Sequence, residues 1–63
     1  MAKKSWYVRL RLDNEDYSDV VIYRHIPASD KASAIHMARR RLHSINPETY
    51  QDYFVERVME EVY

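Results

Sequence analysis

Glycine and cysteine are both absent from the 63-residue sequence. Without cysteine the chain has neither disulfide bonds nor thiolate ligands for a metal, so a small core must stabilise the fold alone or with a partner. Without glycine it lacks the phosphate-binding loops of nucleotide enzymes, whose backbone approaches phosphate only where no Cβ intervenes. We therefore expect no cofactor, and nucleotide-dependent enzymes are disfavoured.

Long apolar runs and an excess of one charge are missing as well. No run approaches the roughly 20 apolar residues that a membrane-spanning helix requires, and residues 1–4 are not followed by the apolar core of a signal peptide. Ten Lys and Arg balance ten Asp and Glu, so the chain lacks the basic excess of a typical nonspecific nucleic-acid binder. The sequence predicts a single small domain, residues 1–63, in the cytoplasm and without a membrane segment.

Charged and aromatic residues are nevertheless abundant, and the charge is unevenly distributed. Residues 1–46 contain nine Lys and Arg against five Asp and Glu, whereas residues 47–63 contain one against five. The tail is therefore acidic and the body basic.

Six Tyr, one Trp and one Phe are many for this length, and Tyr and Trp combine apolar contact with a hydrogen bond at interfaces. This composition favours a protein-binding surface.

Residues 5–12 alternate apolar and polar side chains, which predicts a half-buried strand. Its predicted inward face consists of Trp6, Val8, Leu10 and Leu12. Its predicted outward face consists of Tyr7, Arg9 and Arg11. Residues 13–16 favour a turn, in which Asn14 is the residue best suited to a positive φ in the absence of glycine.

Residues 19–26 are rich in β-branched and aromatic side chains and predict a second strand. One set of alternating positions comprises Val20, Ile22 and Ile26, and the other comprises Val21, Tyr23 and His25. Arg24 interrupts the first set. We predict an antiparallel hairpin in which Val20 and Ile22 point inward beside Leu12 and Leu10. The opposite facing remains open, because a shift of one residue reverses every side chain.

Residues 30–45 form the only long segment with a helical period, and Pro27 is expected to end the strand before them. Ser29 is the predicted N-cap, and Asp30 in the first turn suits the helix dipole. At about 100° per residue, the predicted packing stripe comprises Ala32, Ala34, Ile35, Ala38, Leu42 and Ile45. The opposite side is predicted to carry Ser33, His36, Met37, Arg40 and Ser44. Pro47 should end the helix, because the residue before a proline is pushed out of the helical region.

Residues 52–63 fit either a third strand or an amphipathic helix. The helical stripe would comprise Phe54, Val55, Val58, Met59 and Val62. A two-stranded hairpin is weak alone, however, and a third strand would let one helix cover one face of a sheet. We therefore predict an α+β domain of ββαβ order, with a three-stranded antiparallel sheet and the helix on one face. A ββαα order with a helical C-terminal segment is the alternative.

No residue pattern marks an enzyme or a metal site. His36 and His43 are seven residues apart, which is about 10.5 Å along a helix and too far to chelate one metal. No serine lies in a motif that would activate it as a nucleophile. We therefore predict a protein that is not an enzyme and holds neither a metal nor a cofactor.

Basic residues outline two surfaces. Arg39, Arg40 and Arg41 point about 100° apart on a helix and so spread their charge, which gives the helix the role of a scaffold. The outward face of the hairpin instead gathers aromatic and basic side chains, with Val21 and His25 beside them. Such a platform can stack bases or anchor a protein partner. The predicted partner-binding residues are Tyr7, Arg9, Arg11, Tyr23, Arg24 and Arg57.

Short segments in all four expected elements carry a resemblance to a known family. They are residues 3–6 (KKSW) in the first strand, 22–23 (IY) in the second, 30–32 (DKA) at the helix start and 55–58 (VERV) in the last strand. Together they span most of the chain. In length and element order the chain resembles the small inhibitor of bacterial RNA polymerase that podovirus coliphages encode.

The resemblance implies a phage protein that blocks host transcription by binding the polymerase at its DNA-entry jaw through basic residues of the last strand. Only Arg57 matches those basic residues, since Met59 occupies the next basic position and acidic residues follow. We therefore expect a small phage-type protein in the host cytoplasm that binds and inhibits a bacterial protein, such as RNA polymerase or a defence complex. A nucleic-acid-binding protein that uses the Tyr- and Arg-rich sheet face is the alternative. A homo-oligomeric virion component is a third hypothesis.

Overall fold

A computed structural model describes residues 4–61 and shows a three-stranded antiparallel sheet with one helix packed on it. The elements, in chain order, are β1 (Lys4–Asp13), β2 (Ser18–Ala28), α1 (Lys31–Ile45), the short 3-10 helix η1 (Tyr50–Asp52) and β3 (Phe54–Glu61). The predicted α+β class and ββαβ order are confirmed, and the helical alternative for the C-terminal segment is wrong.

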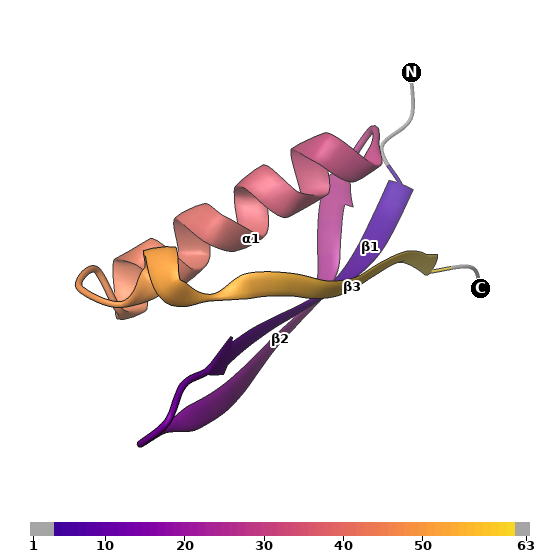
Figure 1. Ribbon diagram of the computed structural model, residues 1–63. Coiled ribbons are helices and arrows are strands. Elements are labelled where there is room, and N and C mark those ends of the chain that lie inside the picture. Colours follow the sequence, from indigo (N-terminus) through magenta and orange to yellow (C-terminus); the bar gives the residue numbers. More distant parts are fainter. Residues whose placement is uncertain (1–3, 62–63) are drawn as a thin grey trace.

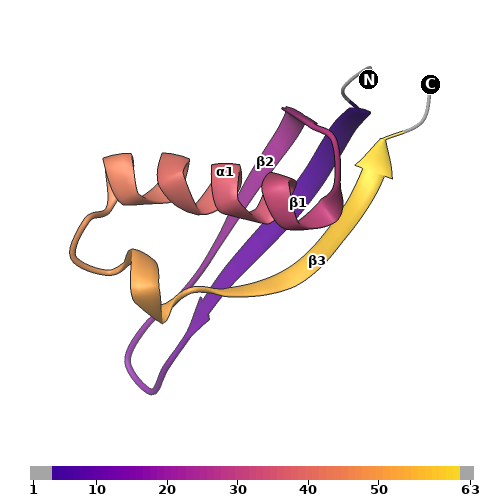
Figure 2. The same ribbon diagram turned by 90° about the horizontal axis from the view of Figure 1, so that it is seen from above.

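The first strand lies in the middle of the sheet, whose order is β2-β1-β3. Both neighbours run antiparallel to β1. Figure 1 shows α1 along one side of this sheet, and Figure 2, seen from above, shows it lying obliquely across the strands. One face of the sheet is therefore covered by α1, and the other, which we call the open face, is not.

The core lies between α1 and the covered face. It comprises Trp6, Val8, Leu10, Leu12, Ile26, Ala28, Ala34, Ala38, Leu42 and Tyr53. The alternating positions of β1 are all in this set, so the predicted facing of β1 is confirmed. Complete burial of a side chain such as Leu10 contributes about 1.5–3 kcal/mol to the stability of the fold. Ala34 and Ala38 are small and let α1 approach the strands closely. The indole nitrogen of Trp6 donates a hydrogen bond of 2.9 Å to the carbonyl of Ala28, so the largest core side chain is also satisfied.

A β-bulge in β2 overturns the predicted facing of that strand. Trp6 pairs with Ile26 and Val8 pairs with Tyr23, so two β2 residues lie opposite Tyr7 alone. A bulge of this kind shifts the alternation by one residue. Val21 and Tyr23 therefore pack toward the core before the bulge, and Ile26 does so after it.

The corrections follow directly from the bulge. Val20 and Ile22, which we predicted to point inward, are exposed on the open face, with relative exposures of 40% and 47%. Val21 and Tyr23, which we predicted to point outward, are half-buried against the core. His25 is exposed as predicted, and its φ of 59° is the one positive value among non-glycine residues 4–61.

The turns and caps differ from the predictions in three places. Asn14 does not adopt a positive φ; its side-chain oxygen accepts hydrogen bonds from the backbone of Asp16 and Tyr17 instead. Pro27 lies inside β2 and does not end it, which is tolerated because β2 is an edge strand. Asp30, not Ser29, is the N-cap of α1, and its carboxylate accepts a 2.8 Å hydrogen bond from the Ser33 N–H.

The helix buries a narrower stripe than the sequence predicted. Ala34, Ala38 and Leu42 are buried, but Ile45 is 65% exposed. Met37, which we placed on the outer side, packs partly against the core. The helix ends as predicted before Pro47, and the backbone N–H of Asn46 closes the last turn on the Leu42 carbonyl at 2.7 Å.

The connection into β3 is fixed to the hairpin by a tyrosine. Tyr53 is 3% exposed, and its hydroxyl donates a 2.6 Å hydrogen bond to the Asp19 carboxylate at the start of β2. This bond to Asp19, together with burial, raises the pKa of the Tyr53 hydroxyl far above its ordinary value of 10.0. The hydroxyl therefore stays protonated, and the chain entering β3 is held against β2.

Candidate functional site

The open face of the sheet consists of rows of side chains that cross the three strands. Residues paired across an antiparallel ladder point to the same face. Arg11 pairs with Val20 on one side and Phe54 on the other, and Arg9 lies between Ile22 and Arg57. Tyr7 pairs with Met59 on β3 and faces the bulge on β2. The rows across the open face are Val20–Arg11–Phe54, Ile22–Arg9–Arg57 and the bulge–Tyr7–Met59.

Large apolar side chains on the open face are left in solvent. Val20, Ile22, Phe54 and Met59 are 40%, 47%, 48% and 43% exposed. They come from both edge strands, so they border the central strand on its two sides. Large apolar side chains left exposed on one face, with polar residues among them, are typical of a protein interaction site.

A single glutamate pairs with both arginines at the centre of the open face. Glu56 is the extra residue of a second bulge, where the register between β1 and β3 shifts after Arg9. Its carboxylate lies 3.4 Å from Arg9 Nε and 3.2 Å from Arg11 Nη1. The Arg9 contact is an ion pair without hydrogen-bond geometry, which leaves Arg9 Nε buried and without a hydrogen-bond acceptor. The two guanidinium groups are thus held in place beside the apolar residues.

Arg57 differs from the other basic residues of the strands because it makes no ion pair or side-chain hydrogen bond within residues 4–61. It is exposed and lies on the open face next to Arg9. A free guanidinium beside exposed apolar side chains can form a charge-assisted contact with a carboxylate of a partner. Arg57 therefore gives the open face an unneutralised positive charge.

Glu61 ties the bulge of β2 to the rest of the sheet. Its side chain is 7% exposed and accepts hydrogen bonds from the His25 backbone N–H at 2.7 Å and from the Ser5 hydroxyl at 3.0 Å. Arg24 Nη2 lies 3.3 Å away. Burial opposes ionisation of Glu61, but these hydrogen bonds and the nearby cationic side chains outweigh it and lower the pKa of the carboxyl. An ionised Glu61 thus stabilises the left-handed backbone at His25.

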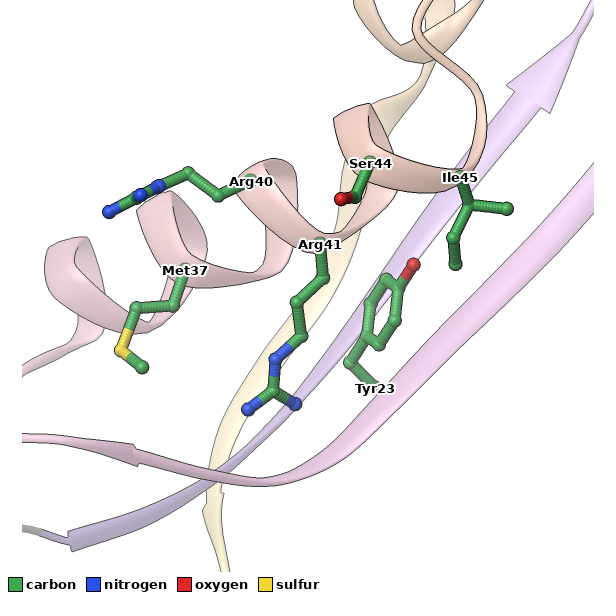
Figure 3. Close-up of a pocket in the computed structure, with 6 residues that line it drawn as sticks. All are labelled: Tyr23, Met37, Arg40, Arg41, Ser44 and Ile45. Atoms are coloured by element: carbon green, nitrogen blue, oxygen red, sulfur yellow. The ribbon is translucent and has the colours of Figure 1, made fainter.

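The structure brings four of the six predicted partner-binding residues together and separates the other two. Tyr7, Arg9, Arg11 and Arg57 share the open face. Arg24 lies at the bulge, where it pairs with Glu61. Tyr23 is on the helix side and lines a groove against α1, as Figure 3 shows. Burial raises the pKa of the Tyr23 hydroxyl, an effect that the charge of Arg41 partly offsets.

The sequence reasoning did not assign the open-face residues that surround the arginines. These are Val20, Ile22, Phe54, Glu56 and Met59. The signal was present at Arg24, since a charged residue that interrupts an apolar alternation can mark a bulge as well as a weak strand. Placing a bulge there would have exposed Val20 and Ile22 and kept Ile26 inside.

Comparisons with models of protein families, with curated proteins and with solved structures found no match to this chain. Among residues 4–61 no three histidine and acidic side chains gather as ligands for a metal ion. In the same part of the chain, no helix has the length and apolar character needed to cross a membrane. The geometry of the surfaces is therefore what supports a functional proposal.

Proposed function

We propose that the protein is a non-enzymatic binding protein that inhibits a bacterial host protein by docking its open sheet face onto it. The observation that carries this proposal is the gathering of Val20, Ile22, Phe54 and Met59 in solvent around the arginines of β1. A rigid sheet presents these side chains without a large loss of conformational freedom on binding, which favours affinity.

The chemistry of the open face indicates what kind of surface it fits. Its apolar side chains require an apolar patch on the partner, since they gain free energy only when both surfaces lose water. Arg57 is unneutralised, and Arg9 and Arg11 share one carboxylate, so the complementary patch carries acidic side chains near its centre or rim. Charge complementarity of this kind raises the association rate and selects the partner.

The element order supports the same proposal. The chain folds as strand, strand, helix, strand, as the small phage inhibitors of RNA polymerase that it resembles do. A shared architecture does not fix a function, and the basic residues of the last strand are represented here by Arg57 alone. We therefore propose RNA polymerase as the first partner to test and a host defence complex as the second.

Binding through this face can be tested by capture with matched variants. Tagged wild-type protein and the variants Phe54→Asp, Arg57→Glu and Arg40→Glu are incubated with nuclease-treated bacterial lysate, and captured proteins are identified by mass spectrometry. Arg40 is an exposed arginine on α1 and serves as the control for charge reversal. We expect one stoichiometric partner with wild type and Arg40→Glu, and about a tenfold or greater loss of affinity with the two open-face variants.

Inhibition is tested on the purified partner. Wild-type protein at a concentration above its Kd should reduce the activity of the partner, and Phe54→Asp should not. Circular dichroism of each variant verifies that the fold persists. A partner that Arg40→Glu loses as fully as Phe54→Asp contradicts docking through the open face, and a captured protein whose activity is unchanged contradicts inhibition.

A further inference from the structure

We call the side of α1 that carries Arg39, Arg40 and Arg41 its outer face. None of these three arginines has a partner within residues 4–61. The helix contains no Asp or Glu between Lys31 and Ile45. Within residues 4–61 every ion pair joins two strands, and the side chains of Arg39, Arg40 and Arg41 make no ion pair or hydrogen bond. Their charge is therefore available to a ligand.

Two adjoining grooves run along this face. The first, of about 530 Å³, lies between α1 and β2 and is lined by Tyr23, Met37, Arg40, Arg41, Ser44 and Ile45. The second, of about 440 Å³, is lined by His36, Arg39, Arg40, His43, Ser44 and Tyr50. Because Arg40 and Ser44 line both, the grooves adjoin, and each has arginines and at least one aromatic ring in its wall.

The first groove also holds an unsatisfied donor. The hydroxyl oxygen of Tyr23 is buried and has no hydrogen-bond partner within residues 4–61. Figure 3 shows Arg41 extending from α1 toward β2 beside the Tyr23 ring, whose hydroxyl points toward the C-terminal end of the helix, on the side of Ile45. The groove therefore combines the cation of Arg41 with a hydroxyl that lacks a hydrogen-bond acceptor, and leaving such a buried group unpaired costs free energy.

From these observations we propose that the outer face of α1 binds the phosphate backbone of single-stranded nucleic acid, with successive phosphates in the two grooves. Arg41 and Tyr23 contact one phosphate, and Arg39 and Arg40 contact the next. In the second groove the rings of His43 and Tyr50 pack edge to face, with centroids 4.6 Å apart, and Tyr50 is half-buried, which leaves part of its ring for a base to stack on.

The same face does not suit an acidic protein. Protein interfaces have an apolar centre, and along α1 the large side chain left mostly exposed is Ile45, at the end of the helix. The open face has such a centre and the helix does not. Contacts with a repeated phosphate need charge and donors alone, which is what α1 presents.

Fluorescence anisotropy with a labelled oligothymidylate tests the proposal over a series of KCl concentrations. We expect binding at about 50 mM salt that weakens as salt rises, because bound cationic side chains release counterions. The double variant Arg40→Gln/Arg41→Gln should bind about tenfold or more weakly. It should also lower the slope of log K against log salt by about 0.7 for each arginine lost.

Arg57→Gln is the matched control, since Arg57 is likewise exposed and unpaired but lies on the opposite side of the sheet. It should leave the Kd unchanged within about twofold, and Tyr23→Phe should weaken binding a few-fold without changing the salt slope. Absence of binding by the wild type at low salt overturns the proposal. So does an equal loss with Arg57→Gln, tighter binding to a duplex of the same sequence, or equal competition by polyglutamate. None of these outcomes bears on capture of a protein by the open face.

Discussion

The two exposed surfaces of this domain both carry arginines, but the sheet pairs Arg9 and Arg11 with a glutamate and leaves Arg57 unpaired, whereas none of the helix arginines has such a partner within residues 4–61. On the open face Glu56 lies between Arg9 and Arg11, and apolar side chains surround them. On α1, Arg40 and Arg41 are exposed and Arg39 is half-buried, with no acidic residue on the helix. A net charge of zero therefore conceals two surfaces with different chemistry.

The difference follows from the positions of the glutamates along the chain. The strand β3 carries Glu56, Glu60 and Glu61 and runs beside β1, so its carboxylates reach the cations of the sheet and not those of α1. Ion pairs of this kind are individually weak when exposed, but the Glu61 side chain is only 7% exposed, against 29% for Glu56. The glutamates of β3 are therefore a structural part of the sheet.

The largest effect that separates the two surfaces is expected from Glu61→Ala. This change removes the acceptor for the His25 N–H and the Ser5 hydroxyl and leaves the left-handed residue unsupported. We expect this substitution to destabilise the protein more than any of the changes below. Thermal unfolding measures the loss as a fall in Tm. Glu60→Ala is the control, because Glu60 makes one exposed ion pair, with Lys4. Equal falls in Tm for both variants would show that Glu61 does not stabilise the bulge.

Acid should weaken the sheet through the same residue. The pKa of Glu61 is lowered from its ordinary value of 4.5 in the folded protein. The carboxyl therefore contributes stability that is fully present above about pH 4.5 and is lost as the pH falls through the lower, folded pKa. Urea unfolding at about pH 7 and about pH 3 should show a smaller acid-induced loss of free energy of unfolding in Glu61→Gln than in the wild type. An unchanged loss would assign the acid sensitivity to other carboxyls, such as Asp30.

Removal of one charge should affect the sheet more than the helix. Glu56→Gln breaks the ion pairs with Arg9 and Arg11 and should lower the free energy of unfolding by about 1 kcal/mol, less at high salt. Arg40→Gln breaks no pair and should change it by less than about 0.5 kcal/mol. Chemical denaturation of the two variants at low and high salt compares them, and a larger effect of Arg40→Gln would mean that α1 is not electrostatically free.

The smallest effect is expected from Ile22→Thr on the open face. Ile22 is 47% exposed, and threonine keeps the β-branched shape that suits a strand. The free energy of unfolding should stay within about 0.5 kcal/mol of the wild type, while affinity for a captured partner should fall. A large loss of stability would indicate that the exposed apolar residues serve the fold and not an interface.

Much of the fold could be predicted from the sequence because its strongest patterns are local. The apolar side chains that alternate from Trp6 to Leu12 all point to one face along β1. The period of the apolar residues around Ala38 is that of a helix. The strand β3 needed a further argument, that one helix covers one three-stranded sheet, since Phe54 and Val58 fit a helix as well.

The facing of β2 could not be predicted from alternation alone, because a bulge changes its phase within the strand. Arg24 alone interrupts the alternation in the sequence, yet Arg24 and His25 are the two residues opposite Tyr7. Glu61, which holds this bulge, is distant in sequence and has no local signal. The sequence therefore placed the residues of β1 and Arg57 on the face where the structure has them. It placed Tyr23 on the wrong face.

The bulge and Pro27 also make the two edges of the sheet unequal. Along β2 the left-handed backbone at His25 interrupts the row of hydrogen-bonding groups, and Pro27 offers no N–H, so an incoming strand finds no continuous template there. Along β3 the eight residues from Phe54 to Glu61 contain no proline and no positive φ. The bulge at Glu56 disturbs the β3 edge as well, but every residue of β3 keeps its N–H, so a strand from another chain meets fewer obstacles there than along β2.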